Sequence, residues 1–449
     1  MAASWLRILP ARLRDRVESS PTLRRLVPNT GWLVADRLGR MAVSLVVSAW
    51  VARYLGPDSF GRYNFALAWV AIFTAFTTFG LERIAVRELV KSPEQARTIL
   101  GSAFTLRLAG GVICFAGATA SLALLRPGDA EMLSMVAILS GVYVLQAFDV
   151  IDYWNQARVR ARATVMAMSV GFLMASIARV VLIVMKAPVI AFTWPWWAEI
   201  GAGSLGLAIG YQLREGSLLD WRVARDRITQ LLRDGFPLML SGLMVMIYSR
   251  IDQVMLGQMA TAHELGIYAA AVKLVEAWYF LPSAIAASAF PSVVAARQIS
   301  EEVFEYRMQK LYDLMARLSY VICIPVSLGA VLWTRLIFGD AYAASAPMLA
   351  LLIWSLVFTS LGAARGLFLS AMNWNWAYLM TVTVGCVVNV VLNLVLIPRI
   401  GGMGAVIASC VGYWAATHGS CYLYPPLFRT AGMLTKSLIP WRRERPVTP

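Results

Sequence analysis

Arginine and aspartate residues occur inside stretches that are otherwise apolar enough to cross a membrane. The stretch WLVADRLGRMAVSLVVSAWVARYLG, residues 32–56, carries Asp36, Arg37 and Arg40 in its first third. Arg37 and Arg40 are three residues apart and share a helix face, and Asp36 can pair with Arg40. A charge at the bilayer centre costs about 3 kcal/mol, so such residues face a bundle interior or a wet cavity. A cavity with surplus arginine selects anions, and the guanidinium fork suits phosphate.

Further charges lie at depth in the apolar runs of the remaining chain. The candidate ligands of a phosphate group, in addition to Arg37 and Arg40, are Arg250, Lys273, Arg317 and Arg365. The carboxylates that could balance them, or carry a coupling H+ or Na+, are Asp36, Asp149, Asp152, Asp252 and Glu276. Arg107, Arg179 and Glu199 also lie within apolar runs. Embedded charges of this kind mark transport paths.

Simpler roles stay open for several of these charges. Lys273 and Glu276 are three residues apart and can pair within one helix. Asp149 and Asp152 precede a basic segment and can pair locally. Three arginines can instead snorkel to the inner membrane surface, namely Arg107, Arg317 and Arg365. A cavity role is therefore favoured most strongly for Arg37, Arg40 and Arg250.

The elements that hold these charges are membrane spans. The chain has 449 residues, of which 59% are hydrophobic and 14% charged, whereas a soluble domain is about a quarter charged. A span requires about 20 apolar residues. The apolar runs predict an all-α polytopic membrane protein with twelve spans, at 30–54, 60–82, 98–125, 131–156, 164–186, 188–212, 236–258, 265–294, 311–334, 344–371, 374–397 and 401–428.

The spans divide into two sets of six around the longest internal connection. This division predicts two six-helix lobes around a central cavity, with an N-lobe at 30–212, a cytoplasmic linker at 213–235 and a C-lobe at 236–428. Residues 1–29 read as an interfacial amphipathic and basic segment, with a disordered basic tail as the alternative. Residues 429–449 form a second basic tail.

The basic charge is distributed unequally across the predicted membrane. The net charge is +15 with 40 Lys and Arg. If the N-terminus is cytoplasmic, 26 of these residues fall in cytoplasmic segments, six on the opposite side and the remaining eight within spans. Such asymmetry places both termini in the cytoplasm and makes anionic inner-leaflet lipids a partner. It argues against nucleic-acid binding, for which basic residues gather on one face.

Metal and cofactor chemistry find no support in the sequence. The chain has two histidines and five cysteines, and the cysteines show no paired spacing. Neither a metal cluster nor a disulfide framework is expected. We therefore predict no cofactor.

A weak repeat relates the two predicted lobes. The segment FGRYNFA, residues 60–66, follows the connection between spans one and two and begins span two, and LGIYAAA, residues 265–271, begins span eight in the same way. Both copies contain Gly-x-Tyr-x-x-Ala at the same place within their set of six. Parallel placement predicts two related bundles about an axis along the membrane normal.

Three stretches resemble a known family. WVARYLGPDSFGRYNFA (50–66), GLERIAVRELVK (80–91) and the run from YSRIDQVMLGQ to AIAASAFP (248–291) are similar to Wzx-type oligosaccharide flippases of the multidrug/oligosaccharidyl-lipid/polysaccharide (MOP) exporter superfamily. The resemblance covers residues 29–428. It implies a V-shaped pair of lobes with a cationic cavity, in a bacterial inner membrane.

The resemblance also implies an activity. The expected function is translocation of undecaprenyl-diphosphate-linked oligosaccharide, such as an O-antigen repeat unit, from the inner to the outer leaflet. Contact with other polysaccharide-assembly membrane proteins is a further expectation. A cation-coupled small-molecule exporter of the same superfamily is the alternative. A glycan polymerase or ligase is less favoured because no predicted outer loop is long, so we expect a transporter and not an enzyme.

Overall fold

The regular elements of the computed structural model are helices. It describes the backbone of residues 21–372 and 374–439, and side chains from residue 39 onward except at 161, 163, 291, 370, 371 and 375. The α-helices of the first half are α2 (Pro21–Thr78), α3 (Leu81–Lys91), α4 (Ala96–Leu125), α5 (Ala130–Leu145), α6 (Val150–Ala157), α7 (Ala161–Val184) and α8 (Pro195–Arg214). Short 3-10 turns join several of them, at Pro93–Gln95, Gln146–Asp149, Val189–Thr193 and Leu218–Asp220.

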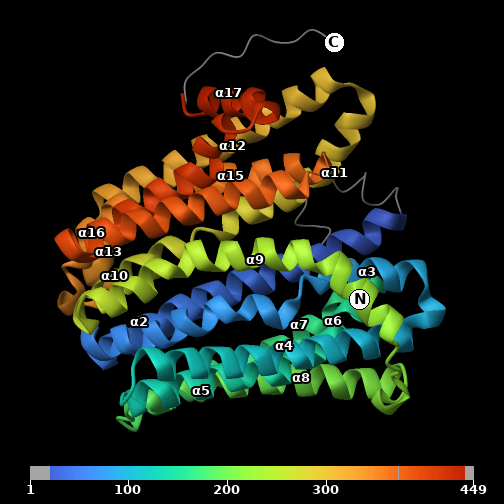
Figure 1. Ribbon diagram of the computed structural model, residues 1–449, viewed down its shortest axis with the longest axis horizontal. Helices are drawn as coiled ribbons and strands as arrows, with labels where there is room; N and C mark the ends of the chain where they lie inside the picture. Colours follow the sequence, from blue (N-terminus) through green and yellow to red (C-terminus); the bar gives the residue numbers. More distant parts are fainter. Residues whose placement is uncertain (1–20, 373, 440–449) are drawn as a thin grey trace.

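The second half continues in the same way. Its α-helices are α9 (Arg225–Met259), α10 (Ala262–Glu276), α11 (Phe280–Ile299), α12 (Glu301–Leu328), α13 (Ala330–Phe338), α14 (Ser345–Leu352), α15 (Ser355–Ala371), α16 (Asn375–Thr417) and α17 (Phe428–Ser437). Figure 1 shows two stacked groups, with α2–α8 in blue to green and α10–α17 in yellow to red. Helices α2 and α9 lie along the boundary between these two lobes.

The number of membrane crossings agrees with the prediction of twelve. Nine helical stretches of the described chain are long and apolar enough to span a membrane. Two of them contain two crossings each, because the backbone of α2 breaks at Gly56 and that of α16 breaks at Ile400 and Gly401. The 20-residue helix α8 provides the remaining crossing. Gly56 has φ 69°, a left-handed conformation that suits glycine.

Several predicted spans are interrupted, among them the ninth, where α12 ends at Leu328 and α13 begins at Ala330. The fourth span passes through a 3-10 turn between α5 and α6, the eighth breaks between α10 and α11, and the tenth breaks between α14 and α15. A continuous apolar run predicts that a segment is buried in lipid or protein, but it does not predict where the helix breaks. Irregular backbone at membrane depth is tolerated where it is enclosed by protein or lines a cavity.

The predicted linker is partly helical and packs on the N-lobe. Helix α9 begins at Arg225, so residues 225–235 continue directly into the seventh span. Asp234 of this segment forms an ion pair with Arg87 of α3, at 2.8 Å between Oδ2 and Nη2. Leu231 is buried in a cluster with Leu81 and Leu89 of α3. The start of α9 is thereby fixed to the first lobe, while the rest of α9 packs against the second.

The core joins the lobes at one end. The larger buried cluster contains Val51 and Phe60 of α2 together with Leu265 of α10 and Tyr342. The charge distribution predicts that this end faces away from the cytoplasm, and we call it the outer end. The second cluster lies at the opposite end of the N-lobe. The lobes are therefore fused through buried side chains at the outer end.

Candidate functional site

Helices α2 and α10 meet at the outer end through a reciprocal contact. A Cβ atom on Gly61 would lie 1.9 Å from the carbonyl oxygen of Ala262, and one on Gly266 would lie 1.9 Å from that of Pro57. Gly61 and Gly266 occupy the same position in the two copies of the repeat, as do Pro57 and Ala262. Equivalent residues of the two lobes thus pack against each other, as a pseudo-two-fold axis along the membrane normal requires.

Hydrogen bonds between the lobes reinforce this closure. Arg53 donates to the carbonyl oxygen of Ile337 at 3.0 Å, and the hydroxyl of Tyr342 donates to the carbonyl oxygen of Ala52 at 2.8 Å. Arg126 donates to the side-chain oxygen of Gln258 at 3.1 Å. Two of these bonds are made by arginines of the N-lobe to groups of the C-lobe. The outer end is closed by polar as well as apolar contacts.

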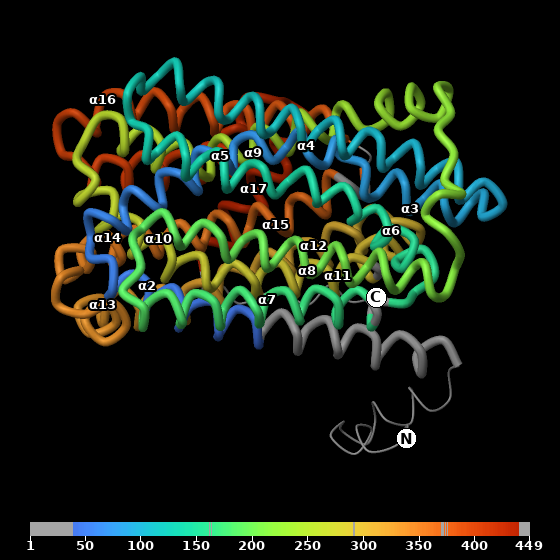
Figure 2. The backbone as a smooth tube through the Cα atoms, turned by 90° about the horizontal axis from the view of Figure 1, so that it is seen from below, coloured from blue at the N-terminus to red at the C-terminus, as the bar shows by residue number. Residues whose placement is uncertain are grey.

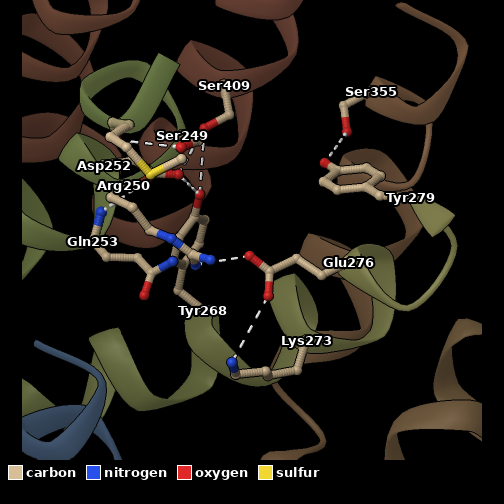
Figure 3. A network of polar contacts seen from close by, with 11 residues as sticks. Ser249, Arg250, Asp252, Gln253, Tyr268, Lys273, Glu276, Tyr279, Ser355 and Ser409 are labelled. Carbon is tan, nitrogen blue, oxygen red and sulfur yellow. Dashed lines mark hydrogen bonds and ion pairs between the residues drawn. The ribbon is translucent and has the colours of Figure 1, made fainter. Parts of the chain in front are cut away.

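On the C-lobe side, a glutamate bridges two cations (Figure 3). Arg250 of α9 contacts Glu276 of α10 at 2.7 Å between Nη1 and Oε1, and Lys273 contacts the other carboxylate oxygen at 3.7 Å. The side chains remain 25–31% exposed, so they are not enclosed in the lobe. Met259 ends α9 nine residues after Arg250. At 1.5 Å per residue, Arg250 lies about 14 Å from the outer end of that helix.

On the N-lobe side, a second ion pair adjoins the first. Arg179 of α7 contacts Glu199 of α8 at 3.2 Å. Arg179, Glu199 and Lys273 line one pocket of about 150 Å³, which is otherwise formed mainly by α2. The charge of Lys273 also interacts with those of Arg179 and Arg250. We call these five residues the inter-lobe cluster, namely Arg179, Glu199, Arg250, Lys273 and Glu276.

The inter-lobe cluster carries a surplus of positive charge. Its three cations face two carboxylates, which leaves one positive charge unbalanced. Arg40 adds a further cation at the margin of the pocket. Its guanidinium lies 5.6 Å from the ring centroid of Phe172, a pocket-lining residue, and donates to Ser169 at 3.2 Å. Charges interact more strongly in such a partly desolvated place than in water. The arrangement can hold an anion that competes with Glu276 for Arg250 and Lys273.

Asp252 belongs to a different environment from Arg250, although only one residue separates them. It is 5% exposed and accepts hydrogen bonds from the hydroxyls of Tyr268 and Ser409, the latter at 3.0 Å. The backbone N–H of Gln253 donates to its other oxygen at 2.8 Å. Residues two apart point to different sides of a helix. Asp252 therefore faces the interior of the C-lobe, and Arg250 faces Glu276.

The other predicted carboxylates lie in the N-lobe. Asp149 contacts Arg107 at 3.3 Å, and Arg107 also donates to the hydroxyl of Tyr153. Asp152 accepts a hydrogen bond from Gln156 at 2.8 Å. These groups form a separate polar network around the interrupted fourth span. Among the residues that the structure describes, no hydrogen bond or ion pair links this network to the inter-lobe cluster.

The remaining predicted ligands are also dispersed. Arg365 is 2% exposed and donates to the carbonyl oxygen of Thr417 and the hydroxyl of Thr381, each at 2.9 Å, so it does not snorkel. Arg317 is exposed on α12, on the side that carries the exposed Leu314 and Val321. Asp36 and Arg37 lie in α2, and their side chains fall outside the described residues.

Two members of the cluster, Arg179 and Glu199, were not among the predicted site residues. Both were recognised as charges within spans five and six. Their pairing was not predicted because the two residues are 20 positions apart on separate helices. The signal that could have found them is their shared depth. Arg179 lies five residues before the end of α7, and Glu199 lies four residues after the start of α8.

Residues 26–294, more than half of the chain, match the family described as polysaccharide biosynthesis protein. The chain belongs to this family. No curated protein matches it by sequence. The matched region covers the first eight predicted spans and includes all five helices that carry or border the inter-lobe cluster, namely α2, α7, α8, α9 and α10.

Solved transporter structures share the fold. An inward-facing multidrug resistance MATE family transporter of the MOP superfamily superposes with a TM-score of 0.73 at 16% identity, covering 88% of this chain and 96% of that chain. The lipid II flippase MurJ, in an inward closed conformation, gives 0.70 at 12% identity, covering 90% of each. An outward-facing MATE family transporter gives 0.59 at 16% identity, covering 92% and 96%. At these identities the likeness establishes the MOP fold alone.

Proposed function

We propose that this protein flips undecaprenyl-diphosphate-linked oligosaccharide from the inner to the outer leaflet of a bacterial inner membrane, as a Wzx-type member of its family. An O-antigen or similar polysaccharide repeat unit is the proposed cargo. The observation that carries this proposal is the surplus of positive charge in the inter-lobe cluster, beside a pocket between the lobes. Membership of the family described as polysaccharide biosynthesis protein supports a cargo of this class.

The cluster supplies charged hydrogen-bond donors that replace the water molecules a diphosphate loses when it leaves water. Burying an ionised group without partners costs many kcal/mol, and charge-assisted hydrogen bonds from guanidinium and ammonium groups offset that cost. Arg250 and Lys273 already share one carboxylate, Glu276. The diphosphate replaces that carboxylate as their partner. The polyprenyl chain stays in lipid between the lobes, and the sugars occupy the wet cavity.

The closed outer end supports a mechanism of alternating access. The lobes are joined there by the contact of Gly61 and Gly266, so the cargo is taken up from the inner side in this conformation. The higher TM-score of the inward-facing transporter than of the outward-facing one supports this assignment. Rocking of one lobe against the other would break the outer contacts and expose the cluster outward.

The test is removal of two cations of the cluster. Arg250→Ala and Lys273→Ala should each lower export of surface glycan about tenfold or more, because each substitution removes a charge-assisted hydrogen bond. Undecaprenyl-linked intermediates should accumulate. The matched control is Arg335→Ala, which removes an exposed arginine of the C-lobe near the outer end. Full glycan export by both variants, at unchanged membrane abundance, would refute the role of the cluster.

A cation-coupled small-molecule exporter is the second candidate, and the likeness to MATE family transporters favours it among the alternatives. The purified protein in proteoliposomes separates the two functions. Translocation of lipid-linked oligosaccharide without efflux of cationic dyes supports the flippase. Dye efflux that is driven by a H+ or Na+ gradient, without movement of the lipid, supports the exporter.

A further inference from the structure

A second, larger pocket lies on the N-lobe between α7 and α8, apart from the inter-lobe cluster. Its volume is about 760 Å³. The two helices pack side by side, and Figure 2 shows them next to each other in the N-lobe. The pocket lies where α7 begins and α8 ends, the end of the lobe that the charge distribution predicts to face the cytoplasm. Nothing in the proposed transport mechanism uses it.

The pocket opens toward lipid. Its α7 residues Met166 and Val170 are 59% and 54% exposed, and the same face continues through the exposed Ile177. The α7 residues that line the inter-lobe pocket, Phe172 and Arg179, lie on the opposite side of the helix. On α8, Ile209 and Leu213 beside the pocket are also exposed. The pocket is therefore a groove in the lipid-facing surface of the lobe.

The cytoplasmic end of the groove is strongly basic. Arg160, Arg162 and Arg214 line it together with one carboxylate, Glu215. Arg160 forms an ion pair with Glu215. Arg162 and Arg214 are exposed and form no ion pair with any residue whose side chain the structure describes. Three guanidinium groups against one carboxylate leave two positive charges above an apolar trough.

The floor of the trough is made of small residues. Gly206 and Gly210 of α8 are one helical turn apart and line the groove. A Cβ atom on Gly210 would meet nothing within 4 Å, and one on Gly206 would meet the Cβ of Ala167 at 3.0 Å. Space above Gly210 is therefore open rather than filled by a neighbouring helix. An acyl chain can lie in that space between the two helices.

We propose that this groove is a binding site for an anionic phospholipid of the inner leaflet. The lipid phosphate lies between Arg162 and Arg214, and one acyl chain runs along the trough over Gly210. Charge complementarity selects this occupant, because basic pockets between spans on the cytoplasmic side bind anionic headgroups. The groove faces away from the inter-lobe pocket, which argues against the transported diphosphate lipid. The proposal is independent of the proposed transport function.

The test measures lipid binding to the full-length protein, purified in detergent, by native mass spectrometry. Phosphatidylglycerol should bind and phosphatidylcholine should bind much more weakly. In the double variant Arg162→Gln with Arg214→Gln, the affinity for phosphatidylglycerol should fall about 30-fold, since each basic residue near an anionic lipid contributes roughly a factor of five. The matched control is Lys91→Gln with Arg233→Gln, which removes two exposed basic residues of the same end outside the groove.

A second variant tests the trough. Gly210→Leu fills the open space, and a leucine is favoured over glycine inside a helix, so the fold should be retained. This variant should also lose phosphatidylglycerol binding while keeping all its arginines. Equal losses in the control pair and the groove pair, or unchanged binding by Gly210→Leu, would overturn the site. If inorganic phosphate competed for the groove as well as phosphatidylglycerol does, the groove would be a simple anion site. If undecaprenyl phosphate displaced phosphatidylglycerol, the groove would belong to the transported lipid.

Discussion

Arg250 and Asp252 show what can be predicted about single residues and what cannot. Their position within an apolar run predicts that both are enclosed by protein. It does not say which of the two faces the other lobe, because that depends on the partner that each meets on a distant span. The structure pairs Arg250 with Glu276 and places Asp252 against Tyr268 and Ser409. Arg365 likewise finds its partners 16 and 52 positions along the chain.

The first prediction at this scale concerns coupling. If Asp252 carries the coupling H+ or Na+, Asp252→Asn should make flipping insensitive to an imposed H+ or Na+ gradient, because the amide cannot take up a proton or supply a full negative charge. The measurement is flipping in proteoliposomes with and without each gradient. Asp340→Asn, at an aspartate that is 90% exposed, is the control. A variant that still responds to the gradient as the parent does would exclude this role.

A second prediction concerns stability. Thr381→Val removes one of the acceptors of the buried guanidinium of Arg365, and no described carboxylate pairs with that group. We expect a loss of about 1–3 kcal/mol in the free energy of unfolding, measured as a lower Tm in detergent. Thr383→Val is the matched control, because its hydroxyl bonds only within its own helix turn, to the carbonyl oxygen of Leu379. Equal loss in both variants would argue against a specific role of Arg365.

At the scale of elements, helix number and approximate boundaries were predictable, and helix breaks were not. The run at 265–294 is apolar enough to predict one continuous span, yet the chain breaks between α10 and α11, directly after Glu276. The opposite difference occurs at the outer connections. Polar and turn-forming residues at 55–59 suggested a loop, whereas α2 continues through a kink at Gly56. The residue types show which segments are polar, but the packing of neighbouring helices determines whether a segment forms a loop or a kink.

The third prediction follows from the packing of α2 on α10. Gly61→Ala should force the two helices apart, because its Cβ would lie 1.9 Å from a backbone carbonyl oxygen that cannot rotate away. We expect easier opening at the outer end. The readout is labelling of a Val51→Cys residue, 3% exposed in the parent, by an impermeant maleimide from outside. Gly242→Ala, where a Cβ meets nothing within 4 Å, should leave labelling unchanged. Unchanged labelling in Gly61→Ala would show that the contact does not hold the outer end closed.

At the scale of the whole molecule, the two lobes and their parallel repeat followed from span number and from the shared Gly-x-Tyr segments. The conformation did not, because alternative lobe arrangements of one transporter differ by only a few kcal/mol. Hydropathy is nearly the same in either arrangement. The reciprocal contact of Gly61 and Gly266 connects the sequence repeat with the arrangement of the lobes. These two glycines are equivalent in the sequence repeat, and in the structure they lie where the two lobes meet.

The fourth prediction, at the scale of the whole molecule, tests movement of the lobes. Asp58 and His263 approach to 3.1 Å across the outer end and are exposed. Replacing them by Asp58→Cys and His263→Cys and joining the thiols with a short bifunctional reagent should hold that end closed and stop flipping. Either single variant treated in the same way should remain active. Unimpaired flipping by the joined protein would mean that the outer end need not open.

The kinks at Gly56 and Gly401 have a consequence outside the membrane. Since α2 and α16 each turn back almost within the helix, these crossings return without a trailing loop on the far side. Proteases need several residues of extended backbone to cut, and antibodies need an accessible epitope. These two connections at the outer end therefore offer a protease no extended backbone to cut and an antibody little accessible loop.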